Sequence, residues 1–325
     1  MRAIIPVAGV GTRLRPHTYT LPKVLLNVAG KPILGHILDK LIKEGITSAT
    51  IIVGYLGDLV EEYLRTNYDL DFEFIEQPVR EGLGHSIYLA QHALGEEPVL
   101  IILGDTIFDV DLRPVISGEH SSLGVKHVDD PRRFGVVEMQ GEFVSHLVEK
   151  PEVPPTNLAM VGLYYIRHPR MLAECLAELV EQDRRTRGEY QLTDALQMMI
   201  DRGEKFVTFH VDAWLDCGKP ETLLETNRHL LDRAPAALQI PGVVVNPPVH
   251  VAPTAVITNS IIGPYATIAD GAVVTDSVIA DSIVGANASV EQAMLRQSII
   301  GNDATVRGTF NRINAGASSE LELGF

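Results

Sequence analysis

The chain has 325 residues, and its 27 basic and 42 acidic side chains give a formal net charge of −15 at pH 7. This length is enough for one large α/β domain and a smaller second one. The negative charge disfavours nucleic acid and anionic membranes as partners. The two cysteines, Cys175 and Cys217, offer neither a disulfide framework nor a metal-binding spacing. No apolar run approaches the ~20 residues of a membrane span. From the net charge, the cysteine count and the lack of such a run together, we expect a cytoplasmic protein with no nucleic-acid and no membrane partner.

Apolar runs alternate with amphipathic segments through the first hundred residues. The expected strands are 3–8, 49–53, 72–76 and 99–103, and the expected helices are 33–44, 56–65 and 84–94. Such alternation indicates βαβ units in a doubly wound sheet of the α/β class. Shorter strands at 123–128, 136–139 and 143–148 predict some antiparallel pairing, which makes the sheet mixed. Helices are expected at 169–182, 192–202, with Thr193 as its N-cap, and 220–231.

The composition changes beyond residue 232. Similar tetrapeptides begin at Ser260, Ser282 and Ser298, and aliphatic residues recur every six positions. A hexapeptide period predicts a short parallel β-helix, whose appearance matches the left-handed β-helix of hexapeptide-repeat proteins. An open end of such a stack is an exposed edge, so a second copy is a plausible cover and we expect a homo-oligomer formed through the β-helix. The expected domains are 1–235 and 236–314, followed by a tail at 315–325.

The segment 9–23, GVGTRLRPHTYTLPK, connects the first predicted strand to the segment before the first predicted helix. In an open α/β sheet, ligands bind at the carboxyl ends of the strands. Gly9 and Gly11 allow successive backbone N–H groups to turn toward an anion. Arg13, Arg15 and Lys23 add positive charge around the same place. The segment therefore predicts a polyphosphate-binding loop.

Two common glycine-rich phosphate motifs do not fit this loop. Leu14 occupies the sixth position of the dinucleotide fingerprint, and the Gly-Lys-Ser/Thr ending of a P-loop is missing. The whole string, followed by VAGKPI at 28–33, instead resembles the G-x-G-T-R-[LF]-x-P-x-T-x-x-x-P-K signature of the sugar-1-phosphate nucleotidylyltransferases. The resemblance extends over residues 2–231 and is greatest to the longer glucose-1-phosphate thymidylyltransferases, which carry a C-terminal left-handed β-helix. It implies a Rossmann-like nucleotidyltransferase catalytic domain at 1–235.

Two carboxylates resemble metal ligands of that family. Asp105 follows the predicted strand 99–103, and Asp216 belongs to the string WLDCG at 214–218. Either residue alone is an ordinary turn residue. Nucleotidyl transfer requires a divalent ion to neutralise phosphate charge, and Mg²⁺ takes one or two carboxylates together with phosphate oxygens. The resemblance therefore implies Mg²⁺ as the cofactor, with Asp105 and Asp216 as its ligands.

A second glycine-rich segment at 76–85 resembles the pyrimidine-recognition segment of the family. The amide of Gln77 can read the edge of a base through paired donor and acceptor bonds. Gly82 lets the ring approach the backbone. The alternative is a helix-entry turn with Gln77 in solvent. The resemblance implies that Gln77 and Gly82 contact thymine or uracil.

Three strings, at 134–137, 148–151 and 161–164, resemble the sugar-phosphate wall of the family. Glu149 can accept hydrogen bonds from sugar hydroxyls, and Lys150 can hold the sugar phosphate. Gly135 and Gly162 are expected to leave room for the ring. An exposed Glu-Lys pair is otherwise an ordinary solvated turn. The segment 188–194 resembles the border of the same site.

The activity that the resemblance implies is transfer of a nucleotidyl group from dTTP or UTP to a sugar 1-phosphate, with glucose 1-phosphate as the first candidate and pyrophosphate as the second product. Arg13, Lys23 and Asp105 are the expected catalytic residues. The expected nucleotide-binding residues are Ala8, Gly9, Gly11, Thr12, Arg13, Gln77, Gly82 and Asp105.

Thr106 and Val161 stand where many relatives carry Asn, which leaves the sugar open. A UTP-glucose-1-phosphate uridylyltransferase is the alternative within the family. A bifunctional enzyme with acyltransferase activity would need a base, and His250 is the only histidine after residue 229. A non-catalytic regulatory homologue is the third alternative, although the charged site residues are all present.

Overall fold

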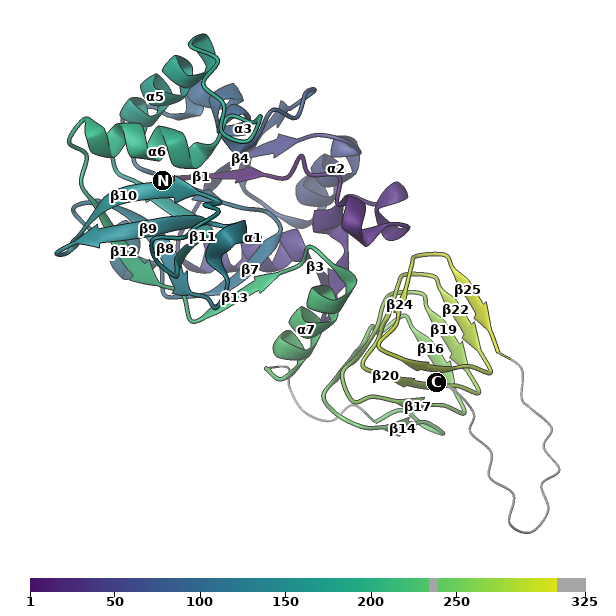
Figure 1. The fold of residues 1–325 in the computed structure, drawn as a ribbon. Coiled ribbons are helices and arrows are strands. Elements are labelled where there is room, and N and C mark those ends of the chain that lie inside the picture. The colour runs from purple at the N-terminus through teal and green to yellow at the C-terminus, as the bar shows by residue number, and fades with distance from the viewer. Residues whose placement is uncertain (234–238, 309–325) are drawn as a thin grey trace. The chain divides into compact units, whose positions relative to one another are not determined.

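The computed structural model describes residues 1–233 and 239–308. The chain divides into two compact units, Met1–Thr226 and Asn227–Phe325, so the division falls within helix α7 (Pro220–Leu231) (Figure 1). The domain limits expected from the sequence remain predictions, and the expected tail at 315–325 lies outside the described residues. Among the described residues, no helix is both long and apolar enough to cross a membrane.

The first unit is built on a nine-stranded mixed sheet with the order β10–β9–β11–β6–β1–β4–β5, in which β8 also pairs with β11 and β12 pairs with β8. Its strands are β1 (Arg2–Pro6), β4 (Ser48–Val53), β5 (Asp71–Glu76), β6 (Val99–Ile102), β8 (Ser121–His127), β9 (Gly135–Gln140), β10 (Phe143–Glu149), β11 (Leu158–Ile166) and β12 (Phe206–His210). Strands β6, β1, β4 and β5 are parallel, whereas β9, β10 and β11 pair antiparallel. This arrangement confirms the predicted mixed α/β sheet.

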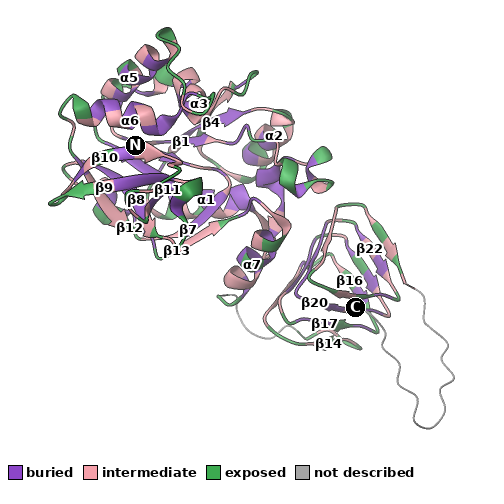
Figure 2. Ribbon diagram, in the orientation of Figure 1, coloured by how far each residue is buried: buried purple, intermediate pink, exposed green. Residues whose placement is uncertain are grey.

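Helices cover both faces of this sheet (Figure 1). They are α1 (Ile33–Lys43), α2 (Gly57–Asn67), α3 (Leu83–Leu89), α4 (Arg113–Ile116), α5 (Pro169–Glu181) and α6 (Leu192–Asp201). Side chains alternate between the faces of a strand, so Ile4 of β1 joins the core formed with α3, α5 and α6. Figure 2 shows the buried residues concentrated along the strands and on the inner faces of the helices. Burial of apolar surface, worth about 25 cal/mol per Å², holds these layers together.

Two local predictions in this unit are wrong, and a central strand was not predicted. The helix expected at 84–94 ends at Leu89 and is followed by a separate 3₁₀ turn, Gln91–Ala93. Thr193 is not an N-cap, because the helix begins after Gln191 and the Thr193 hydroxyl donates a hydrogen bond to Glu149 instead. Strand β11 was not predicted, although it pairs with β6, β8 and β9 near the centre of the sheet.

The second unit is a left-handed parallel β-helix, as the repeats predicted, and its described residues form three four-stranded sheets. The sheets are β14 (Val244–Val245), β17 (Ile261–Ile262), β20 (Val278–Ala280) and β23 (Met294–Arg296); β15 (Val249–Val251), β18 (Ala266–Ile268), β21 (Ile283–Val284) and β24 (Ile299–Ile300); and β16 (Val256–Thr258), β19 (Val273–Thr275), β22 (Ser289–Glu291) and β25 (Thr305–Arg307). Val256 pairs with Val273, and Val273 pairs with Ser289, so successive coils advance 17 and then 16 residues. A coil is therefore slightly shorter than three hexapeptides.

The corners of the β-helix bend through residues in the left-handed region. Asn259, Asp276 and Gln292 have φ values of 45°, 49° and 53° and stack at equivalent positions of successive coils. Asn and Asp, which occupy two of these three positions, tolerate this conformation better than other non-glycine residues do. The amide of Asn259 also donates to Asp276 at 2.6 Å, which links one coil to the next.

Candidate active site

The carboxyl ends of three parallel strands supply the centre of the site. Residues 7–9 follow β1, Gln77 follows β5, and Asp105 lies three residues beyond the end of β6. Backbone hydrogen bonds continue the sheet past the strand ends: the Val7 N–H donates to Ile52 and the Gln77 N–H donates to Val53, both at 2.8 Å. These bonds fix the loops at the edge of an α/β sheet where ligands bind.

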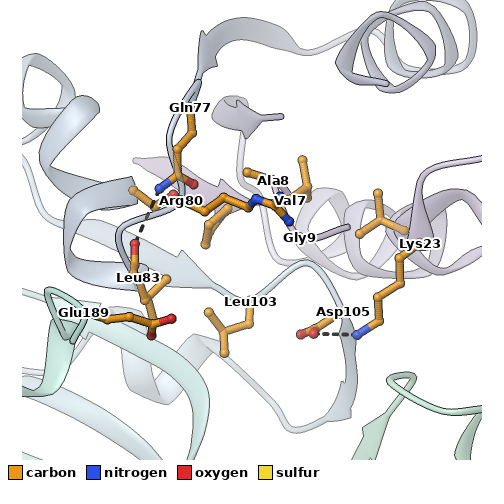
Figure 3. A pocket seen from close by; sticks show the side chains of 14 residues that line it. Val7, Ala8, Gly9, Lys23, Gln77, Arg80, Leu83, Leu103, Asp105 and Glu189 are labelled. Carbon is orange, nitrogen blue, oxygen red and sulfur yellow. Dashed lines mark hydrogen bonds and ion pairs between the residues drawn. The ribbon is translucent and has the colours of Figure 1, made fainter. Parts of the chain in front are cut away.

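A cavity of about 300 Å³ opens at this edge (Figure 3). Its lining includes six of the residues predicted from the sequence: Ala8, Gly9, Lys23, Gln77, Gly82 and Asp105. Leu83 and Leu103 add apolar wall. The amide nitrogen of Gln77 lies 3.5 Å from the carbonyl oxygen of Gly82, and Gln77 is buried. Gln77 therefore does not sit in solvent, as the alternative interpretation of its segment required.

Lys23 and Asp105 form an ion pair in this cavity. The ammonium nitrogen of Lys23 lies 2.7 Å from a carboxylate oxygen of Asp105 (Figure 3). Lys23 belongs to a 3₁₀ turn, Lys23–Leu25, and only 6% of it is exposed. A buried charge requires a partner of opposite sign. The sequence predicted both residues but not that they contact each other, since they lie 82 positions apart.

Arg80 is a cavity residue that the sequence reasoning missed. Figure 3 shows its side chain extending along the cavity toward Gly9. Within residues 1–233 and 239–308, it has no hydrogen bond or ion pair to any other side chain. Its positive charge is therefore available to a ligand, unlike that of Lys23. A basic residue inside the glycine-rich segment 76–85 was the signal that could have identified it.

A second cavity, of about 340 Å³, adjoins the first and shares Leu83, Leu103, Asp105 and Glu189 with it. It brings together six further predicted residues: Arg13, Gly135, Glu149, Lys150, Gly162 and Asp216. Of the predicted set, Gly11 and Thr12 line neither cavity. Gly11 instead adopts φ 64° at the start of the 3₁₀ turn Thr12–Leu14, where it shapes the loop.

Strands β7 (Thr106–Asp109) and β13 (Ala213–Asp216) bring the two predicted metal ligands together. Their antiparallel register places Asp216 opposite Thr106, next to Asp105. The Cys217 N–H also donates to the Asp105 carbonyl at 3.1 Å. Burial raises the pKa of the Cys217 thiol to about 12, so this thiol stays protonated and is no nucleophile.

The carboxylates of Asp105 and Asp216 fit a Mg²⁺ ion. Both line the second cavity and both are partly exposed to solvent. Mg²⁺ keeps several waters and binds through one or two carboxylates plus substrate phosphates. The part of the chain that the structure describes holds no cluster of three or more His, Cys, Asp or Glu suited to a metal, so any ion here would depend on phosphate oxygens as well.

Glu149 ends strand β10 and holds two neighbours in place. One of its carboxylate oxygens lies 2.9 Å from the Lys150 ammonium, and the other accepts the Thr193 hydroxyl at 2.6 Å. The Glu149 side chain is 9% exposed and that of Lys150 is 39% exposed. The pair is therefore not an ordinary solvated turn, because its carboxylate is buried and its ammonium reaches the cavity.

The two glycines of the predicted sugar wall are required by packing. Gly162 has φ 79° and lies at an irregularity of β11, and a Cβ there would approach a Leu103 carbon to 2.5 Å. A Cβ on Gly135 would approach the Met160 methyl group to 2.2 Å. Both glycines line the second cavity, so their expected role of leaving room for a sugar ring stays a prediction.

Two aromatic side chains complete the second cavity, and one predicted basic side chain lies outside both cavities. Phe134 and Trp214 contact each other edge to face, with centroids 4.7 Å apart, and form an apolar wall of the second cavity. Arg15, expected to add charge to the phosphate loop, lies instead over the Tyr19 ring at 5.0 Å and lines neither cavity. The loop therefore directs Arg13 and Lys23, but not Arg15, toward the cavities.

A mixed α/β sheet with paired cavities at its strand ends, basic side chains around them and two aspartates on neighbouring strands is an arrangement suited to phosphorylated ligands. Residues 2–233 match the family described as nucleotidyl transferase, and the chain belongs to that family.

Individual relatives extend this comparison. The chain is 30% identical to a glucose-1-phosphate thymidylyltransferase of Streptomyces antibioticus, with 99% of each chain covered. It is 32% identical to the UTP-glucose-1-phosphate uridylyltransferase AglF of Haloferax volcanii, covering 74% of this chain and 100% of AglF. A solved structure titled as a putative glucose-1-phosphate thymidylyltransferase of Bacillus anthracis superimposes with a TM-score of 0.62 at 29% identity, covering 74% of this chain and 98% of that one.

Some relatives are considerably longer than the matched region. The chain spans 66% of the length of the nucleotidyltransferase Agl11 of Haloferax volcanii. It spans 55% of the length of the bifunctional protein GlmU of Methanocaldococcus jannaschii.

Proposed function

We propose that the protein transfers a nucleotidyl group from dTTP or UTP to a sugar 1-phosphate, with glucose 1-phosphate as the first candidate, and releases pyrophosphate. The observation that carries this proposal is the pair of adjoining cavities that meet at Asp105. Five of the eight residues expected to bind the nucleotide line the first cavity, and the four expected to bind the sugar phosphate line the second, together with Arg13. The named relatives use both thymidylyl and uridylyl donors, so the base is left to the experiment.

In the proposed reaction, an oxygen of the sugar phosphate attacks the α-phosphorus of the nucleotide. The new P–O bond forms as the bond to the bridging oxygen of the β-phosphate breaks, and that oxygen leaves with pyrophosphate. No covalent intermediate with the protein is needed, so catalysis consists of positioning and charge stabilisation.

Each charged residue has a proposed role in this scheme. Arg13 binds the β- and γ-phosphates, Lys23 binds the α-phosphate, and Lys150 holds the attacking phosphate. Asp105 and Asp216 would hold a Mg²⁺ ion, which supplies neutralisation of phosphate charge when bound. Because Lys23 contacts Asp105 at 2.7 Å, the α-phosphate would lie where both groups act on it.

Arg80 adds a further cation to the nucleotide cavity. Since the guanidinium has no protein partner within the described residues and extends toward Gly9, it is suited to bind the triphosphate from the side opposite Lys23. An Arg80→Gln variant would report this contribution as a higher KM for the nucleotide.

The test is pyrophosphate release with glucose 1-phosphate and Mg²⁺, measured in parallel with dTTP, UTP, ATP, CTP and GTP. We expect release with dTTP or UTP only, and its loss in an Asp105→Asn variant. Preference for UTP would identify a uridylyltransferase. A folded wild-type protein that releases no pyrophosphate with any of these nucleotides and binds none of them would contradict the proposal.

Three further expectations from the sequence remain predictions, and each has its own test. Association of copies through the β-helix is checked by the mass of the protein in solution. An added acyltransferase activity, with His250 as its base, is checked by consumption of acetyl-coenzyme A. A cytoplasmic location is checked by fractionation of the cells that make the protein.

A further inference from the structure

The hydroxyl of Ser86 is a buried polar group to which the proposed reaction gives no role. Ser86 lies on α3, one turn after Gly82, and is 3% exposed. Its oxygen has no hydrogen-bond partner among residues 1–233 and 239–308. Leaving a buried hydroxyl unpaired costs about 1–3 kcal/mol.

The usual partner of a helical serine is already in use. Serine in a helix often donates to the carbonyl four residues earlier, which here is that of Gly82. That carbonyl accepts the backbone N–H of Ser86 at 3.1 Å and lies 3.5 Å from the amide nitrogen of Gln77. The hydroxyl is therefore left to find a partner elsewhere, and Ser86 lines the first cavity.

Ser86 belongs to the end of that cavity where a base is expected. Gln77 and Ser86 both contact the Gly82 carbonyl, so the three residues lie together. The phosphate end is marked by the ion pair of Lys23 with Asp105, which Figure 3 shows away from Gln77, across the cavity. A ligand with its phosphates near Lys23 would present its base to Gln77 and Ser86.

We propose that Ser86 is a specificity-determining residue, whose hydroxyl forms a hydrogen bond with the edge of the pyrimidine base of the nucleotide. The proposal rests on the proposed function for the presence of a nucleotide in this cavity. Rotation about the Cα–Cβ bond turns the oxygen toward the ligand, and a hydroxyl can donate to a ring carbonyl or accept from a ring N–H. Ser86 and Gln77 then read the base at two points.

Ser122 provides a matched control within the same unit. It lies on β8, is 4% exposed, and its hydroxyl also lacks a hydrogen-bond partner among the described residues. It lines neither cavity. Ser86→Ala and Ser122→Ala therefore remove the same atom from equally buried positions, and only the first removes it from the cavity.

The experiment is calorimetric titration of the full-length wild type and both variants with dTTP, with UTP and with inorganic tripolyphosphate. Tripolyphosphate occupies the phosphate end without a base. We expect Ser86→Ala to weaken binding of the preferred pyrimidine nucleotide about three- to tenfold, the value of one neutral hydrogen bond. Tripolyphosphate binding should not change, and Ser122→Ala should match the wild type with every ligand. In turnover, the KM for the nucleotide should rise while kcat stays within about twofold.

Two results would overturn the proposed role of Ser86 but leave the proposed function standing. One is a Ser86→Ala variant that binds dTTP and UTP as the wild type does. The other is an equal loss of nucleotide and tripolyphosphate affinity, which would indicate a general disturbance of the cavity. A wild-type protein that binds no pyrimidine nucleotide would overturn this inference and the proposed function together, so the two failures are distinguishable.

Discussion

The two units of the chain differ in whether their polar side chains have hydrogen-bond partners within the protein. In the β-helix, polar side chains at the corners bond to the next coil, as Asn259 does to Asp276 and Ser277 does to Ala293. In the α/β unit, Arg80 and Ser86 line a cavity, and their side chains have no such partner among the described residues. A repeated register supplies such polar groups with partners on the next coil. The cavity at the strand ends has no such repeat, so Arg80 and Ser86 are available to a ligand.

The largest effect should come from the ion pair at the centre of the α/β site. In a Lys23→Met variant, the side chain remains long and unbranched but loses its charge, and pyrophosphate release should fall by ~10² or more, as for other fixed charges that stabilise a transition state. Steady-state kinetics and circular dichroism would measure turnover and folding together.

Lys40→Met is the control for removal of a lysine charge. Lys40 forms a 2.7 Å ion pair with Glu44 at the end of α1 and lines neither cavity, so its variant should keep full turnover. Near-normal turnover of a folded Lys23→Met protein would show that polar groups at the strand ends are no more functional than those of the β-helix.

The next effect concerns stability of the second unit. Arg228, near the end of α7, binds both carboxylate oxygens of Asp281, a β-helix corner residue that is only 7% exposed. Arg228→Leu leaves this buried carboxylate without its main counter-charge, so we expect a loss of about 3 kcal/mol in the free energy of unfolding. Urea denaturation followed by circular dichroism would measure the loss.

An exposed ion pair of the same unit provides the comparison for Arg228. Arg307 lies 3.3 Å from Glu291, and both side chains are largely exposed, so Arg307→Leu should cost less than about 1 kcal/mol. Nucleotide binding should be unchanged in both variants, because the residues of the proposed site all belong to the first unit. Equal losses for the two variants would mean that burial of Asp281 does not decide the effect.

A smaller effect on stability should distinguish serine-to-alanine substitutions in the two units. The Ser277 hydroxyl donates to the Thr275 carbonyl at 2.7 Å and accepts the Ala293 N–H at 3.1 Å. Ser277→Ala leaves that buried N–H unpaired and should cost about 1–2 kcal/mol of stability. Ser86→Ala removes no protein hydrogen bond and should leave the melting temperature unchanged or slightly raised. If Ser86→Ala destabilised the protein as much as Ser277→Ala does, the expected difference between the serines of the two units would be contradicted.

Much of the architecture was predictable because it depends on periodicity and on local loop chemistry. The alternation of strands and helices predicted the α/β sheet, and the six-residue spacing of aliphatic residues predicted the β-helix. The loop that carries Arg13 and Lys23 was recognisable because the signature is contiguous in the sequence. For the same reason, Asp105 and Asp216 could be predicted one at a time from their own strings.

The contacts between distant segments could not be predicted in this way. The pairing of Lys23 with Asp105 depends on which strand ends become neighbours in the sheet. Strand β11 was missed because Gly162 interrupts its apolar run, and only the structure shows the irregularity that this glycine permits. Ser86 gave no signal at all, since an unpaired hydroxyl is recognisable only when its surroundings are known.

The smallest effect is a pH dependence of stability that should be stronger in the α/β unit. His36 of α1 donates a hydrogen bond to the Val28 carbonyl at 2.9 Å, and burial lowers its pKa below the ordinary value of 6.5. The unfolded chain therefore takes up a proton on this side chain at a pH where the folded protein does not. The free energy of unfolding should fall as the pH is lowered through 6.5 toward the folded pKa of His36.

Burial also lowers the pKa of His17 in the first unit and of His250 in the second, so both units should lose stability in acid, the α/β unit through two histidines and the β-helix through one. A His36→Gln variant keeps an N–H donor for the Val28 carbonyl but cannot titrate. Urea denaturation at pH 5, 6 and 7 should give this variant a flatter dependence than the wild type, and His250→Gln a similar flattening confined to the β-helix. Identical slopes for the wild type and His36→Gln would show that the buried histidine is not what links folding of the α/β unit to protons.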